Sequence, residues 1–101
     1  MESSIEKYLK RRVEAVGGLC WKWTSPGRIG VPDRIVMLKG GIVAFVELKD
    51  SGKTERPSQV VCQNKIKSLG CWVFSSVDSK EKVDALLTAL TLEQIRRGVK
   101  R

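Results

Sequence analysis

Residues 33–49 read DRIVMLKGGIVAFVELK, two apolar runs rich in β-forming residues on either side of Gly40-Gly41. A Gly-Gly pair between two such runs favours a tight hairpin turn, because glycine readily adopts the positive φ angles that these turns require. We expect antiparallel strands over 33–38 and 42–49, in a register where paired residue numbers sum to about 80. This register places Asp33 opposite Glu47 at one edge of the sheet.

The remaining elements follow from hydrophobic periodicity and from turn residues. Apolar spacing of three and four predicts helices, alternation predicts strands, and glycine or proline marks their ends. We expect helices over 3–16, 57–69 and 79–90, a short last helix capped by Thr91, and further strands over 19–24 and 71–76. The order predicts an α/β fold, a mixed sheet flanked by helices, with a right-handed crossover between the third and fourth strands.

Length and hydropathy indicate a single domain over residues 1–101. A chain of this size suits one hydrophobic core of roughly 100–150 residues. Apolar runs fall far short of the roughly 20 residues that cross a bilayer, and residues 1–12 lack a signal-peptide core. We therefore expect a cytoplasmic protein with no membrane partner. The sequence leaves open whether the basic tail, about residues 93–101, contacts DNA or is disordered.

The charge balance indicates which class of binding partner the protein has. The 19 Lys and Arg residues exceed the 11 Asp and Glu residues, for a net charge of +8, which favours nucleic acid through counterion release over an inert basic surface. Histidine is absent and the cysteines form no CxxC pair, which argues against zinc and imidazole chemistry. We expect all three cysteines to be buried. The chain also lacks a glycine-rich phosphate motif, so no nucleotide cofactor is expected.

Asp33, Glu47 and Lys49 form the candidate catalytic group. Two carboxylates facing each other across a ladder repel by up to about 1 kcal/mol, which Mg²⁺ or Mn²⁺ would offset through hard oxygen ligands. The backbone carbonyl of Leu48 is a further candidate ligand. Lys49 shares a strand face with Glu47 and could orient the water that attacks a phosphodiester. The alternative is that these are ordinary salt-bridge groups at strand ends.

Three short motifs carry a family resemblance: SPGRIGVPDRIV at 25–36, FVELK at 45–49 and RPSQ at 56–59. In this order and spacing, the chain resembles the small stand-alone VRR-NUC members of the PD-(D/E)xK nucleases of phages and bacteria. The resemblance implies an α-β-β-β-α-β nuclease core with an additional C-terminal helix. It also implies a metal-dependent endonuclease for branched DNA, such as four-way junctions or flaps, with relatives in repair and recombination, acting in a bacterium or a phage-infected host cell.

Carried over by position, the resemblance implies that Asp33 and Glu47 bind metal, that Lys49 is the catalytic lysine and that Gln59 supports the site. It also places an acid on the first helix. Glu6 lies at the border of the apolar face, whereas Glu2 lies closer to its centre but at a terminus prone to fraying. We favour Glu6 and keep Glu2 as the alternative, binding metal through water.

The expected DNA contacts flank these residues in sequence: Lys22, Ser25, Arg28, Arg34, Lys53 and Arg56. Each could equally be a solvated surface residue, as could Gln63. Trp21 and Trp23 favour a core or dimer-interface role over base stacking, and a homodimer with two sites would suit paired cuts in a junction. The alternative function is a non-catalytic basic DNA-binding or assembly module.

Overall fold

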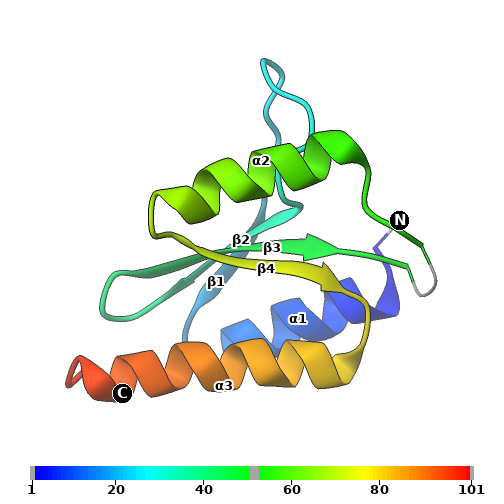
Figure 1. Cartoon of the computed structure of the whole chain (residues 1–101). Helices are drawn as coiled ribbons and strands as arrows, with labels where there is room; N and C mark the ends of the chain where they lie inside the picture. The colour runs from blue at the N-terminus through cyan, green and yellow to red at the C-terminus, as the bar shows by residue number, and fades with distance from the viewer. Residues whose placement is uncertain (1, 51–52, 101) are drawn as a thin grey trace.

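The computed structural model, which describes residues 2–50 and 53–100, has the predicted α/β architecture (Figure 1). A helix, three strands, a helix, a strand and a final helix follow one another along the chain. Their bounds are α1 Ser4–Ala15, β1 Leu19–Lys22, β2 Arg34–Leu38, β3 Ile42–Leu48, α2 Pro57–Ser68, β4 Trp72–Val77 and α3 Lys80–Arg96. The mixed sheet flanked by helices confirms the predicted fold class.

The four strands form one sheet in the order β1-β2-β3-β4. The first three pair antiparallel, and β4 runs parallel to β3 after the crossover through α2. In the β2–β3 hairpin, Arg34 pairs with Val46 and Leu38 with Ile42, so every pair sums to 80 as predicted. Gly40 and Gly41 take φ angles of 95° and 72°, which explains the need for glycine at this turn.

The helices lie on both faces of the sheet, with α1 and α3 side by side on one face and α2 on the other (Figure 1). The apolar core fills the first of these layers. Its fully buried members come from both helices and from alternate positions of the strands: Leu9, Val13, Val36, Ala44, Val46, Val83 and Leu90. By contrast, α2 buries a polar face made of Gln59, Cys62 and Gln63. The buried side of α2 is therefore more polar than the layer formed by α1 and α3.

The C-terminal part corrects the prediction of two short helices. A single helix, α3, runs through Thr91, whose hydroxyl donates to the Leu87 carbonyl at 2.8 Å instead of capping a new helix. After α3, the Arg97 guanidinium donates to the Gly40 carbonyl at 2.9 Å and Val99 lies against Gly40. Arg101 lies outside the described residues.

One cysteine differs from expectation, and the two tryptophans near β1 differ in burial. Cys20 and Cys62 are buried as predicted, but Cys71 is exposed at the start of β4, so the prediction of three buried cysteines was wrong. Trp23 packs on Phe45 with ring centroids 5.3 Å apart, whereas Trp21 is 58% exposed. None of the helices within residues 2–50 and 53–100 is long and apolar enough to cross a bilayer.

Candidate active site

Asp33 and Glu47 meet at the end of the sheet where β2 begins and β3 ends. Extending the hairpin register by one pair beyond Arg34 and Val46 sets them opposite each other. The Leu48 backbone N–H donates to Asp33 Oδ2 at 2.8 Å, which holds this carboxylate against the last residues of β3. Burial raises the pKa of Asp33, and the Leu48 hydrogen bond partly opposes that effect.

Glu47 is the most unusual titratable group at this end of the sheet. Only 1% of the residue is exposed, and burial, together with the nearby Asp33 charge, raises its pKa to about 7. One oxygen, Oε2, accepts a hydrogen bond from Gln59 Nε2. The other, Oε1, is buried and has no hydrogen-bond partner within the part of the chain that the structure describes. A buried carboxylate oxygen of this kind calls for a cationic ligand.

Gln59 connects Glu47 to Lys49. Its side-chain carbonyl accepts from Lys49 Nζ at 2.7 Å and from the Arg56 backbone N–H at 2.9 Å, while its amide nitrogen donates to Glu47. Lys49 Nζ also lies 3.7 Å from Glu47 Oε2. The first turn of α2 thus fixes the lysine and the carboxylate relative to each other, because one amide side chain is bonded to both.

The first-helix glutamates reach the site through Arg34. The Arg34 side chain is 3% exposed, and its guanidinium donates to Glu6 Oε2 at 2.8 Å, to the Cys20 carbonyl at 3.2 Å and to Glu2. Glu6 lines a cavity of about 280 Å³ that also contains Asp33. Glu6 and Asp33 therefore line the same cavity, while the role of Glu6 in the site stays a prediction. Arg34, expected to contact DNA, lies in the interior.

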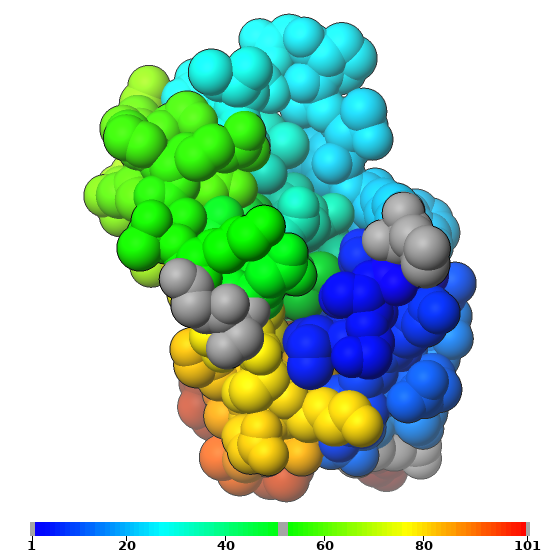
Figure 2. Space-filling view, turned by 90° about the vertical axis from the view of Figure 1, so that its right-hand side faces the viewer, coloured from blue at the N-terminus to red at the C-terminus, as the bar shows by residue number. Residues whose placement is uncertain are grey.

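This cavity opens on the end of the molecule shown in Figure 2, where the surface is hollowed between the first residues of α1 and the segment leading into α2. The residues that line it are Ser3, Glu6, Asp33, Leu48, Lys49, Asp50 and Lys53. Among the described residues, no group of three or more His, Cys, Asp or Glu side chains is arranged around one metal position. The two facing carboxylates and the buried Glu47 Oε1 nevertheless fit a hard divalent cation, whose other ligands would be the Leu48 carbonyl and water.

Comparison with known proteins agrees with this geometry. No protein-family model matches the chain. A solved structure described as a VRR_NUC domain superposes with a TM-score of 0.77 at 39% sequence identity, covering 83% of this chain and 90% of that one. A protein of Acyrthosiphon pisum secondary endosymbiont phage 1, named "Putative nuclease p44", is 45% identical over 69 residues, 68% of this chain and 74% of the relative. The chain belongs to the VRR-NUC family of nucleases. The resemblance inferred from the three motifs is thereby confirmed.

The other predicted contact residues of this VRR-NUC domain remain on its surface around the hollow. Lys22, at the end of β1, and Arg28, in the following loop, are exposed, as are Lys53 and Arg56 before α2. Ser25, in the same loop as Arg28, is half-buried. Among the described residues, Lys53 forms an ion pair with Asp50 alone, at 3.5 Å. Its side chain is 71% exposed, so this weak pair would not prevent it from binding another anion. Their role in DNA binding stays a prediction.

Two features near the VRR-NUC site were missed from the sequence. Gln63 is 2% exposed and not a surface residue; its carbonyl accepts from the Ser75 hydroxyl. Its burial could have been predicted from its spacing of four from Gln59, because residues four apart lie on the same side of a helix.

Ser76 takes a φ of 53° where β4 bulges against β3, and its hydroxyl donates to Glu55 at 2.8 Å. No local pattern marks that residue, because the bulge depends on strand pairing.

Proposed function

We propose that this VRR-NUC nuclease is a deoxyribonuclease that hydrolyses phosphodiester bonds of DNA with Mg²⁺ or Mn²⁺. The observation that carries the proposal is the buried Glu47 carboxylate, which lies opposite Asp33 and has one oxygen without a hydrogen-bond partner among the described residues. Two carboxylates in this position would repel a phosphate backbone unless a cation offset them. The net charge of +8 supports the choice of DNA as the polyanion.

A divalent cation held by Asp33, Glu47 and the Leu48 carbonyl would polarise the phosphate and lower the pKa of the attacking water. Lys49, held by Gln59 at 2.7 Å, orients that water and offsets negative charge on the phosphate as the bond breaks. Gln59 holds the Lys49 and Glu47 side chains in fixed positions relative to each other. Glu6, fixed by Arg34 on the cavity wall, accepts a hydrogen bond from a water in the site. The reaction needs no covalent enzyme intermediate.

We further propose that the nuclease prefers branched DNA and acts as a homodimer with two sites. Support comes from the sheet face on the α2 side, where Leu19, Met37 and Val43 stand in a row across three strands. Leu19 and Val43 are 45% and 42% exposed, and Trp21 on the same face is 58% exposed. A contiguous apolar surface on a highly charged protein suits a second copy, since burying it removes apolar area from water.

A cleavage assay tests the catalytic proposal. Labelled linear, flap and four-way-junction DNA are incubated with the protein and Mg²⁺, Mn²⁺ or EDTA, alongside Asp33→Asn and Lys49→Met. We expect metal-dependent cleavage that falls at least about a hundredfold in both variants, the usual range for lost electrostatic or acid–base groups. Lys65→Met, on the exposed side of α2, is the matched control and should cleave normally.

Binding without cleavage under every condition would instead favour the non-catalytic DNA-binding module. Light scattering tests the dimer separately. Val43→Lys should give a monomer, whereas Leu92→Lys, at a 59% exposed position on α3, should leave the mass unchanged. A wild-type monomer at the concentrations that cleave junctions would rule out paired incision by a stable dimer.

A further inference from the structure

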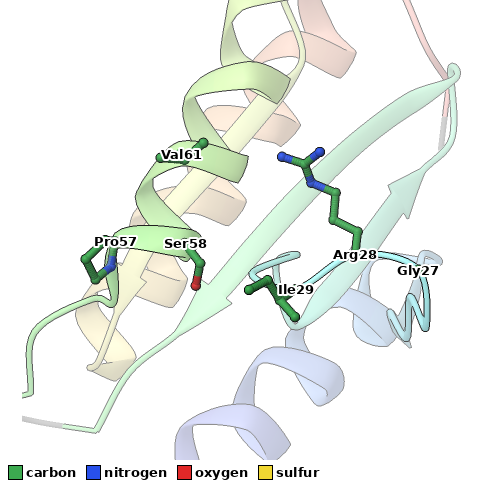
Figure 3. Close-up of a pocket in the computed structure, with 6 residues that line it drawn as sticks. All are labelled: Gly27, Arg28, Ile29, Pro57, Ser58 and Val61. Carbon is green, nitrogen blue, oxygen red and sulfur yellow. The ribbon is translucent and has the colours of Figure 1, made fainter.

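A second concave surface lies beside the active site, between the loop that precedes β2 and the start of α2 (Figure 3). This groove has a volume of about 420 Å³. Its lining residues come from both segments: Gly27, Arg28, Ile29, Pro57, Ser58 and Val61. Figure 3 shows the Arg28 side chain reaching from the loop toward α2, with Ile29 and Ser58 in the space between the two segments. The groove thus combines apolar walls with one guanidinium and one hydroxyl.

The loop backbone packs directly on the helix backbone at one wall of the groove. Gly30 takes a φ of 83°, and a Cβ atom placed there would lie 2.4 Å from the Ser58 carbonyl oxygen and 2.7 Å from its carbonyl carbon. Any side chain at this position would push the loop away from α2 and widen the groove. The width of the groove therefore depends on the absence of a side chain at Gly30.

The groove and the active site use different residues of the same two segments. The loop that carries Gly27 to Ile29 continues to Asp33, and the helical turn that presents Ser58 also presents Gln59, the partner of Glu47 and Lys49. A DNA strand with a phosphate at Asp33 and Glu47 would therefore have a neighbouring nucleotide close to the groove.

The exposed side chains of the groove suit a nucleobase. Ile29 and Val61 are 81% and 51% exposed, so their apolar surface faces solvent. Arg28 is also exposed and takes part in none of the ion pairs formed among the described residues. An aliphatic wall and a planar guanidinium can stack on either face of a base, and the cation complements the adjoining phosphate.

We propose that this groove binds one unpaired nucleobase of the branched DNA, next to the scissile phosphate. The inference rests on the proposed function and extends it, because it gives the nuclease a physical reason to prefer branches. A base in an intact duplex must first be unpaired and unstacked to enter, whereas a base at a flap or branch point is already free. The groove would thus favour branched over linear substrates.

The test measures binding of the full-length protein to flap DNA by fluorescence anisotropy in EDTA, so that cleavage does not interfere. One flap carries a normal base at the first unpaired position and a second carries an abasic site there. We expect wild-type protein to bind the intact flap about tenfold more tightly than the abasic flap, the range for one stacked base. In Ile29→Ser/Val61→Ser, which keeps the Arg28 charge, this difference should vanish, whereas the affinity for linear duplex should change little.

Leu69→Ser is the matched control, since Leu69 is 82% exposed at the far end of α2 and should keep the tenfold preference. Gly30→Ala should lose the preference by displacing the loop, without removing any groove side chain. Equal binding of intact and abasic flaps by wild-type protein would overturn the inference. So would a fall in molecular mass of Ile29→Ser by light scattering, because the groove would then belong to a subunit interface.

The outcome separates this inference from the proposed function. Metal-dependent cleavage of branched DNA without any effect of the abasic site would leave the proposed function standing and remove the groove assignment. Absence of both cleavage and DNA binding would remove both.

Discussion

The two ends of the sheet shift the pKa of a glutamate in opposite directions. At the hairpin end, Glu93 of α3 accepts hydrogen bonds from the guanidiniums of Arg96 and Arg97, which lower its pKa to about 2. At the other end, Glu47 is buried opposite Asp33 and receives one neutral amide and a lysine 3.7 Å away, so its pKa rises to about 7. Both residues are glutamates on regular elements, but they differ in burial and in charged partners.

The opposite pKa shifts of Glu93 and Glu47 distinguish charges that stabilise the fold from charges that suit a catalytic site. The hairpin end also joins the helix to the turn, because Gln94 Nε2 donates to the Lys39 carbonyl at 3.1 Å and Arg97 to the Gly40 carbonyl. There the charges are compensated within the chain, which stabilises the fold. At the other end, no guanidinium among the described residues compensates the Glu47 carboxylate. Carboxylates with perturbed pKa values are typical of catalytic sites, where reactive groups often lower the stability of the fold.

The largest expected effect on stability concerns the arginines of the two ends. Arg34→Met should lower the free energy of unfolding by about 3–5 kcal/mol, because Glu2 and Glu6 lose a buried partner. Arg97→Met, at a side chain 37% exposed, should cost less than about 1 kcal/mol. Urea denaturation of both variants at pH 7 measures the difference. Equal losses of unfolding free energy in the two variants would mean that the buried Arg34 ion pairs are worth no more than the exposed Arg97 pair.

The next prediction uses the pH dependence of Glu47 in EDTA. Its pKa is about 7 in the folded chain against an ordinary 4.5, so the folded state binds more protons between these values and stability falls as pH rises through them. At about 1.4 kcal/mol per pKa unit, ionised Glu47 costs about 3 kcal/mol above pH 7. Glu47→Gln cannot ionise, and should therefore be about 3 kcal/mol more stable than wild type at pH 8.5 but similar near pH 4.5.

Urea midpoints at the two pH values measure this effect, and Glu81→Gln, at an exposed position on α3, serves as the control with no expected change. Metal should act on the same residue: excess Mg²⁺ or Mn²⁺ raises the midpoint of wild type at pH 8.5 and not that of Glu47→Gln. If Glu47→Gln were less stable than wild type at pH 8.5 without metal, ionised Glu47 would not destabilise the fold, contrary to the prediction.

Much of the Glu47 end could be predicted from sequence, because the Gly-Gly turn fixes the register that brings Asp33, Glu47 and Lys49 together. The burial of Arg34 could not, since it depends on α1 delivering two glutamates from a distant part of the chain. At the hairpin end, Thr91 suggested a cap, but the buried stripe of Leu87, Leu90 and Gln94 carries α3 through it. Tertiary packing overrides local capping preference there.

The smallest expected effect lies at Glu93 and has the opposite pH sign to that of Glu47. Because its pKa is depressed to about 2, Glu93 stabilises the fold above the ordinary value of 4.5, and this contribution is lost as pH falls toward 2. Glu93→Gln should therefore lower the unfolding midpoint modestly at pH 7, and the loss should shrink on acidification. High salt should weaken it too, since Arg96 is largely exposed. A midpoint for Glu93→Gln that rises with pH relative to wild type, as expected for Glu47→Gln, would show that the guanidiniums do not compensate this carboxylate.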